Sequence, residues 1–318
     1  MKIITLLITL LYAQLLVAQE IKGTVKDSKQ SPIPYVNLGI PAKAFGITTD
    51  DLGNFKFKLT NEKETDTIYV SAIGYKLLLL SVATLKQYSI NNTPIVLTEL
   101  IYELNPVTVR PNDYETKTLG NTNVAAMKCI NIAGTVSVKD SVAYQQKVKE
   151  KGLNPKSIGI EIGNKIKIKS GQQTFIDKIQ FKTCVEPNDT AIYSVNIYST
   201  GKTTERVFTP IGIIKLQTLN TALKTPIIVK VIGKTIVHNI DITKQNIEVN
   251  DDFIVALQCI YSSNKQMNIG VNTNVFGSTD LLIRASVMEE WIKVPLIDVT
   301  FVSATVTYKK QKSIFKFW

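Results

Sequence analysis

The only histidine of the chain, His238, limits the catalytic chemistry that the sequence can support. A Ser-His-Asp triad would have to use this residue, and so would a catalytic zinc site with a histidine ligand. His238 lies in the alternating run 235–240, on the same strand face as Ile236 and Ile240. Because a triad needs three side chains in one geometry, we expect a structural core or cross-strand histidine. The motifs H-E-x-x-H, G-x-S-x-G and H-x-x-E are absent from the sequence.

Paired acidic residues are the next candidates for chemistry. The doublets are Asp50-Asp51, Asp251-Asp252 and Glu289-Glu290. Adjacent residues of a strand point to opposite faces, so a doublet does not provide the two facing acids of a glycosidase. We expect turn or strand-entry roles for the two aspartate doublets. Calcium binding by Asp251 and Asp252 remains the alternative. Glycine-rich phosphate loops are absent from the sequence, and we expect no catalytic residue, metal or cofactor.

Aromatic residues near expected loops offer a binding hypothesis. Five of them could stack on sugar rings if two or more were exposed together: Tyr193, Tyr198, Tyr261, Phe276 and Trp291. Such side chains are more often packed in the core than exposed for binding. A carbohydrate-binding module is therefore the alternative function rather than the first.

Residues 1–19 have the pattern of a secretory signal peptide. Lys2 precedes an apolar run that is too short to span a bilayer as a helix, and small residues precede Gln19. The three cysteines, Cys129, Cys184 and Cys259, allow one disulfide and one free thiol in an oxidising compartment, or three buried thiols. We expect at least one of them to be buried and inert. The sequence thus predicts an exported protein of the periplasm, the outer-membrane surface or the extracellular space.

Strand patterns dominate the chain after residue 20. Hydrophobic residues, which make up 44% of the sequence, alternate with polar ones in short runs, and this predicts an all-β fold. We divide the chain into a first sandwich at 20–110, a polar linker at 111–123 and a second, jelly-roll-like antiparallel β-sandwich at 124–318. Alternation on both sides of Gly163-Asn164 predicts a hairpin with its turn at these two residues. The best helical candidate is Ser141–Lys151.

Several short motifs in the first unit carry a family resemblance. They are Gly23-Thr24-Val25, Pro34-Tyr35-Val36-Asn37, Thr49-Asp50, Gly53-Asn54-Phe55 and Ser71-Ala72-Ile73-Gly74-Tyr75. In this combination residues 20–100 resemble the carboxypeptidase-like regulatory domain of secreted Bacteroidetes proteins. The resemblance implies a transthyretin-like, seven-stranded Greek-key sandwich without catalytic residues of its own. The second unit is similar to uncharacterised β-sandwich modules that follow this domain, and that similarity implies no activity.

The charge of the chain bears on its partners. The formal net charge is +11, carried by dispersed lysines rather than by a cluster, and so a nucleic-acid partner is not expected. The basic segment 308–318 predicts peripheral contact with an anionic membrane surface. Together these features predict a non-enzymatic accessory or scaffold protein of the cell envelope, which binds an envelope protein or a glycan.

Overall fold

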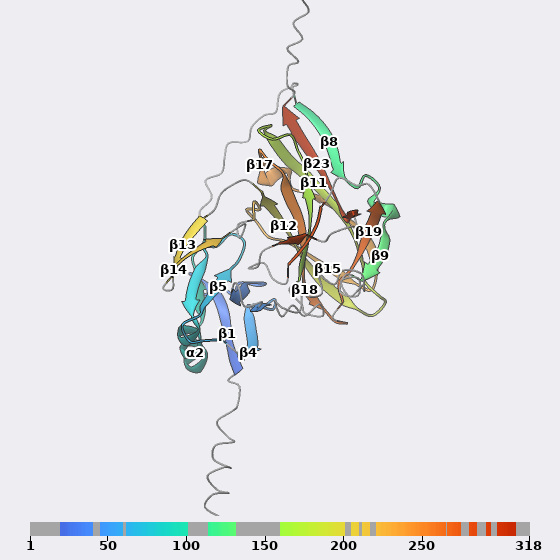
Figure 1. Ribbon diagram of the computed structural model, residues 1–318. Coiled ribbons are helices and arrows are strands. Elements are labelled where there is room, and N and C mark those ends of the chain that lie inside the picture. The colour runs from blue at the N-terminus through green and yellow to red at the C-terminus, as the bar shows by residue number, and fades with distance from the viewer. Residues whose placement is uncertain are drawn as a thin grey trace, which may run out of the picture.

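The structure is a computed structural model that describes residues 20–40, 45–59, 62–100, 114–131, 160–200, 205–209, 212–216, 221–264, 266–274, 280–284, 291–293 and 298–309. Nearly all of its regular elements are strands, grouped in antiparallel or mixed sheets, and the expected all-β class is confirmed. In Figure 1 the blue and cyan first sandwich lies beside the larger green-to-red second sandwich. The predicted signal peptide, the helix candidate Ser141–Lys151 and segment 310–318 lie outside the described residues.

The first sandwich has two sheets. Its strands are β1 (Glu20–Asp27), β2 (Asn37–Ile40), β3 (Phe45–Thr48), β4 (Asn54–Lys58), β5 (Thr67–Ser71), β6 (Leu78–Ser81) and β7 (Ile95–Leu97). One sheet has the order β4-β1-β7 and the other has the order β3-β2-β5-β6. Alternate residues of β1 and β4, among them Ile21, Val25, Phe55 and Phe57, are buried between the sheets, as the period-two pattern predicts.

The turn before β4 has the chemistry expected for Asp50. Its Oδ1 accepts hydrogen bonds from the backbone N–H of Leu52 at 2.9 Å and of Asn54 at 2.7 Å. Gly53 has a φ of +73°, and a Cβ there would lie 2.6 Å from the carbonyl oxygen of Val25. Only glycine meets both conditions, and this explains why the sequence carries Asp and Gly at this spacing.

One helix, α2 (Val82–Asn91), is absent from the sequence-based expectations. The Ser81 hydroxyl caps its first turn by accepting from Thr84 N at 3.0 Å, and Asn92 ends it in the left-handed region. The helix buries only Val82 and Leu85, so its hydrophobic face is too narrow to stand out among strand patterns. It packs against β1, where Lys22 N donates to the Ser89 hydroxyl at 2.9 Å.

The second sandwich is built from a six-stranded and an eight-stranded sheet. Its strands are β8 (Tyr114–Gly120), β9 (Lys128–Asn131), β10 (Glu161–Ile166), β11 (Thr174–Cys184), β12 (Thr190–Ser199), β13 (Glu205–Thr209), β14 (Gly212–Leu216), β15 (Ile227–Ile232), β16 (Thr235–Asp241), β17 (Ile247–Val249), β18 (Phe253–Ser262), β19 (Asn268–Asn274), β20 (Asp280–Arg284), β21 (Ile292–Lys293), β22 (Asp298–Thr300) and β23 (Val302–Lys309). Two 3-10 turns, η2 (Val124–Ala126) and η3 (Thr243–Gln245), lie between them.

The two sheets of the second sandwich pack against each other through one face of each sheet. The six-stranded order is β15-β12-β18-β10-β20-β21, and the path of the eight-stranded sheet is β22-β19-β11-β23-β8, with β16 and β17 pairing β11 and β9 pairing β19. Strands β13 and β14 form a separate hairpin. Apolar side chains of both sheets form one continuous core, in which Val195 and Leu257 of one sheet join Phe181 and Val306 of the other.

The expected linker at 111–123 contains strand β8, so it is not an unstructured connection. β8 pairs antiparallel with β23 from Gly120–Ser303 to Tyr114–Lys309. Most of its side chains are exposed, and therefore the segment shows no apolar period. Strand β8 is held at the sheet edge by backbone hydrogen bonds. The pattern of hydrophobic residues in a sequence does not reveal such bonds.

The expected hairpin at Gly163-Asn164 is wrong, because β10 continues straight through these residues between β18 and β20. The Asn164 side chain is buried and links the two sheets, donating to Val299 O and accepting from Phe301 N, both at 2.8 Å. A Cβ on Gly163 would lie 2.6 Å from Ile254 Cγ2 and 3.1 Å from the Trp291 ring. These two residues, which resemble a turn, serve close packing in the middle of a strand.

Candidate binding site between the two sandwiches

The outer face of the six-stranded sheet carries a buried polar row. Ser194, Gln258, Glu161 and Arg284 are cross-strand neighbours on β12, β18, β10 and β20, in that order. All four are at most 6% exposed, although they face away from the apolar core. Because buried polar groups cost free energy unless they are paired, this row must be covered and internally bonded.

Glu161 and Arg284 form an ion pair at the end of this row. Glu161 Oε2 lies 2.6 Å from Arg284 Nε and 2.5 Å from Arg284 Nη2, and both residues are fully buried. The guanidinium carbon lies 4.7 Å from the centre of the Tyr198 ring and 4.2 Å from that of Trp291. Aromatic faces favour a desolvated cation, so the two rings compensate part of its lost hydration.

The other oxygen of Glu161 is bonded by uncharged side chains. Oε1 accepts from Asn196 Nδ2 at 2.7 Å and from the Tyr198 hydroxyl at 2.9 Å. Burial, followed by the negative charge of Glu161, raises the pKa of Tyr198 well above its usual value, although Arg284 opposes the shift. Tyr198 therefore stays protonated and donates. Both carboxylate oxygens are bonded and Glu161 is fully buried, so these bonds hold its side chain in one orientation.

The first sandwich covers part of this face. Gln258 Nε2 donates to Asn37 Oδ1 of β2 at 2.9 Å and lies 3.4 Å from the Thr48 hydroxyl of β3. The Thr48 hydroxyl also donates to the same Asn37 oxygen at 2.9 Å. Ile73 of the first sandwich packs against the apolar core of the second. Through Gln258 the polar row thus reaches the junction between the two sandwiches.

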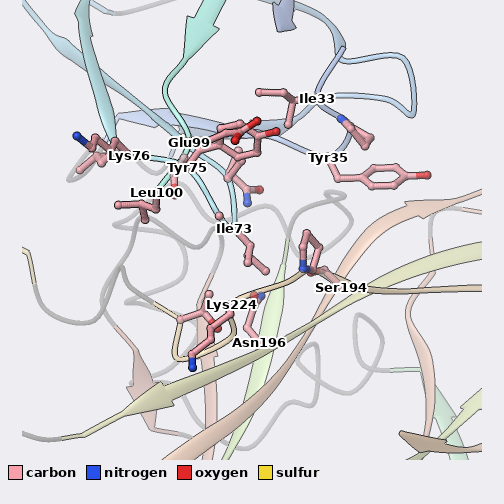
Figure 2. Close-up of a pocket in the computed structure, with 18 of the residues that line it drawn as sticks. Ile33, Tyr35, Ile73, Tyr75, Lys76, Glu99, Leu100, Ser194, Asn196 and Lys224 are labelled. Atoms are coloured by element: carbon pink, nitrogen blue, oxygen red, sulfur yellow. The ribbon is translucent and has the colours of Figure 1, made fainter. Parts of the chain in front are cut away.

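Next to this junction lies a cavity of about 840 Å³ that both sandwiches line. The first sandwich contributes Tyr35, Asn37, Ile73, Tyr75, Lys76 and Glu99. The second contributes Ser194, Asn196, Tyr198, Thr221, Lys224 and Ile228. Figure 2 shows Tyr35, Tyr75 and Glu99 on one side and Ser194, Asn196 and Lys224 on the opposite side, with Ile73 between them.

Two of the sequence motifs meet at this cavity. Tyr35 of the Pro34–Asn37 motif has a φ of +57°, a left-handed conformation that a bulky aromatic residue rarely adopts. Hydrogen bonds on both sides hold it there: Tyr35 N donates to Asp50 O at 3.3 Å, and Val36 N donates to the Thr49 hydroxyl at 2.8 Å. Tyr75 of the second motif follows Gly74, whose carbonyl accepts from Leu100 N at 2.7 Å.

The charges around the two tyrosines are acidic. Burial, then Asp51 and Asp50, raise the pKa of Tyr35. Burial, then Asp27 and Glu99, raise the pKa of Tyr75. The two lysines that line the cavity, Lys76 and Lys224, come from different sandwiches. The cavity therefore carries both signs of charge at its rim and neutral polar groups in its wall.

His238 lies where the sequence analysis expects it, on a strand and facing a neighbouring one. On β16 it is opposite Phe181 of β11, with ring centres 4.8 Å apart, and its Nε2 lies 2.8 Å from the Thr183 hydroxyl. Burial, followed by the charge of Lys234, lowers the pKa of His238. The described residues bring no carboxylate within hydrogen-bond distance of its ring, and it lines no part of the cavity.

The acidic doublet Asp251-Asp252 was expected to have a strand-entry role, with calcium binding as the alternative. Asp251 accepts from the Ser170 hydroxyl at 2.7 Å, while Asp252 accepts from Ile168 N at 3.0 Å and pairs with Lys165 at 3.1 Å. These are strand-entry contacts, in agreement with the expected role. Within the described residues, no group of three His, Cys, Asp or Glu side chains is placed to hold a metal ion. Glu289-Glu290 lies outside those residues.

The four candidate aromatics among the described residues do not form one exposed surface. Tyr193 is in the core, Tyr198 is buried against the ion pair, and Trp291 packs edge-on to Tyr198 at 5.9 Å. Tyr261 is 45% exposed and lies outside the cavity lining, and Phe276 is outside the described residues. Tyr198 is the one described candidate that also lines the cavity, whereas the other two cavity tyrosines, Tyr35 and Tyr75, occur in the sequence analysis only within family motifs.

The cysteines form one disulfide and leave one free thiol, which is one of the two arrangements left open. Cys129 of β9 is bonded to Cys184 of β11. Cys259 is buried and free, and burial raises the pKa of its thiol to about 12. The expectation that at least one cysteine is buried is confirmed, and its inertness stays a prediction, because the thiolate is the reactive form of cysteine.

Sequence reasoning assigned no role to Glu161 or Arg284. They are 123 positions apart, and each is a single charge in a short run of mainly apolar residues. A weak signal was present, because Glu161 takes a polar place within the hydrophobic run 158–162. Only the pairing of β10 with β20 brings the two together.

Comparison with known families places the first sandwich. Residues 21–109 match the CarboxypepD_reg-like domain. The resemblance expected from the motifs of the first unit is thereby confirmed, and the two-sheet arrangement agrees with it. The CarboxypepD_reg-like domain contributes Tyr35, Asn37 and Tyr75 to the cavity. A comparison with curated protein sequences finds no match.

Three solved structures are distantly similar. The cysteine protease and lectin-like domains of a surface layer associated protein of Clostridium difficile are 11% identical with a TM-score of 0.29, covering 48% of this chain and 32% of that one. A membrane-associated protein of unknown function from Bacteroides fragilis is 12% identical with a TM-score of 0.19, covering 92% and 97%. A structure of infectious bursal disease virus is 8% identical with a TM-score of 0.22, covering 93% and 65%. This chain thus spans about a third of the first of these proteins, and scores this low establish no shared fold.

Proposed function

We propose that this chain is a non-catalytic accessory protein of the cell envelope, which fixes its CarboxypepD_reg-like domain against a second β-sandwich to present a joint interaction surface. The junction between the sandwiches carries this proposal. Gln258 bonds Asn37 across it, and Ile73 packs into the neighbouring core. A rigid pair of domains offers a partner a preformed surface, which lowers the entropic cost of binding.

Two further observations support an envelope location. The Cys129–Cys184 disulfide is typical of oxidising compartments outside the cytosol. The pattern of residues 1–19 is that of an export signal. No helix among the described residues is long and apolar enough to cross a membrane.

The proposal is tested by capture of partners from the native envelope. Tagged mature chain, residues 20–318, is cross-linked in an envelope extract, and the retained proteins are identified by mass spectrometry. We expect one or a few envelope proteins to be retained in near-stoichiometric amounts. Retention of no protein, or turnover of an envelope substrate by the purified chain, contradicts the proposal.

Matched variants show which sandwich makes the contact. Ile232 and Tyr261 are 59% and 45% exposed on the second sandwich, and replacing both by serine removes apolar surface without touching the core. Leu52 and Ile90, at 61% and 66%, are the corresponding exposed residues of the first sandwich. Loss of the captured protein with one pair and not with the other assigns the surface.

Glycan binding is the second candidate function. The observation that favours it is the cavity, where tyrosines lie among asparagine, serine and threonine side chains. Binding pockets for small molecules combine aromatic walls with a few placed polar groups in this way. A failure of protein capture leaves this candidate standing, because the cavity and the outer surfaces are separate regions.

A further inference from the structure

We infer that the cavity between the two sandwiches is a binding site for a neutral oligosaccharide. The inference deepens the second candidate function by naming its site and its ligand class. A volume of about 840 Å³ lies within the range of about 300–1,000 Å³ that is usual for ligand pockets. The site exists only where both sandwiches are present, since each contributes half of its wall.

Polar atoms with unused hydrogen-bonding capacity face this space. Asn196 donates through Nδ2 to Glu161, and no described residue bonds its Oδ1. Asn37 accepts twice through Oδ1, and no described residue bonds its Nδ2. Ser194 adds a hydroxyl that can donate or accept. A donor, an acceptor and a hydroxyl in one wall match the hydroxyl groups of sugars, which both donate and accept.

The ion pair behind this wall fixes its orientation. Glu161 accepts from Asn196 Nδ2, and this sets which end of the amide points into the cavity. Arg284 neutralises Glu161, so the wall presents neutral dipoles rather than a charge. Glu161 accepts from Arg284, Asn196 and Tyr198, and this network holds the outward groups in one geometry, as a preorganised site requires.

Tyr35 supplies the aromatic surface. A non-glycine residue in a left-handed conformation stores strain, and such residues gather at ligand sites. Here the strained backbone belongs to a ring that lines the cavity, with Tyr75 as a second ring. The carbon-bound hydrogens of a sugar ring form an apolar face that packs on tyrosine rings.

The charges favour a neutral ligand over an ionic one. Lys76 and Lys224 are balanced by Glu99 in the lining and by the aspartates near Tyr35. A site for an anion would collect cations, and a site for a cation would collect acids. Affinity for a neutral sugar should therefore change by less than about twofold when salt is raised about tenfold.

The test is isothermal titration calorimetry of the mature chain with cellohexaose, maltohexaose and mannohexaose. An oligogalacturonate serves as the acidic probe, and extended octapeptides serve as the peptide probe. We expect saturable binding of at least one neutral sugar, with little dependence on salt. Binding of only the acidic sugar, of only peptides, or of none of the probes overturns the inference.

Two variants with matched controls locate the site. Tyr35→Gly removes the ring and suits the left-handed backbone, and we expect about a tenfold loss of affinity without a large fall in Tm. Gln30→Gly is its control, because Gln30 also has a positive φ, of 67°, and lies outside the cavity lining. Sugar affinity that is unchanged in Tyr35→Gly contradicts the inference.

The second pair blocks the cavity from the other side. Ile228→Trp fills the space from β15, whereas Ile232→Trp lies on the same face of the same strand, outside the cavity lining. We expect binding to be lost only in Ile228→Trp. Equal effects of the two tryptophans would place the sugar elsewhere. The Tyr35 and Gln30 pair changes none of the exposed residues that are tested for protein capture, and so the two proposals can fail separately.

Discussion

Both faces of the six-stranded sheet carry buried residues, yet their chemistry differs. The inner face carries Val195, Leu257 and Ile162 and meets the opposite sheet of the same sandwich. The outer face carries the row from Ser194 to Arg284, and the first sandwich covers part of it. Gln258, where the first sandwich covers the outer face, is a hydrogen-bonding side chain, whereas the residues buried between the two sheets of the second sandwich are mainly apolar. Directional bonds fix how two bodies meet, which apolar contact alone does not.

The largest expected effect comes from breaking the ion pair of the outer face. Arg284→Met leaves Glu161 buried without its cation, and we expect a loss of about 3–5 kcal/mol in the free energy of unfolding. Urea denaturation followed by tryptophan fluorescence measures it. The double variant Glu161→Gln/Arg284→Met is the control, since glutamine still accepts from Asn196 and Tyr198, and it should recover most of the loss. A small effect of the single variant would mean that the outer face is open to water.

Gly163→Ala tests how closely Trp291 covers the outer face. The added Cβ would lie 2.6 Å from Ile254 Cγ2 and 3.1 Å from the Trp291 ring, and we expect a loss of about 1–3 kcal/mol. The measurement is the same denaturation experiment. The control is Gly171→Ala, where no atom lies within 4 Å of the added carbon and only the positive φ is unfavourable. If Gly163 were in an exposed turn, as its sequence suggests, the overlap with Trp291 and Ile254 would not arise.

Gln258→Leu tests the bond across the junction. It removes the donor to Asn37 while keeping a side chain of similar size, and we expect a loss of about 1 kcal/mol. Limited proteolysis between the two sandwiches should become faster, because fewer bonds hold them together. Gln180→Leu is a useful control, since Gln180 is bonded only to Asn239 within the second sandwich. Equal protease sensitivity of both variants would show that Gln258 does not fix the junction.

The smallest effect concerns His238 and pH. Burial lowers its pKa in the folded protein, so the unfolded chain binds more protons than the folded one. Its contribution to stability is present above the unfolded pKa of about 6.5 and decreases as pH falls below that value. We expect the stability difference between the wild type and His238→Gln to shrink on acidification from neutral pH. A difference that grows on acidification would show that the folded state favours the imidazolium.

Some features were predictable because they depend on neighbours along the chain. The turn at Asp50–Gly53 follows from local side-chain bonding, and the strands of the first sandwich follow from period-two alternation. Helix α2 was missed because its buried face holds two residues, and β8 because its strand is exposed and polar. The Gly163-Asn164 pair was misread because turn-forming residue types also serve close packing inside a strand.

The amino-acid order alone determines the all-β class, the family of the first sandwich and the place of His238 on a strand. Each of these depends on spacings of a few residues, which local backbone preference and side-chain periodicity control. Only the tertiary structure decided that Glu161 meets Arg284, that Cys129 bonds Cys184, and that Tyr35 shares a cavity with Asn196. These pairs lie 55 or more positions apart, and strand pairing and the contact between sandwiches, rather than local preference, bring them together.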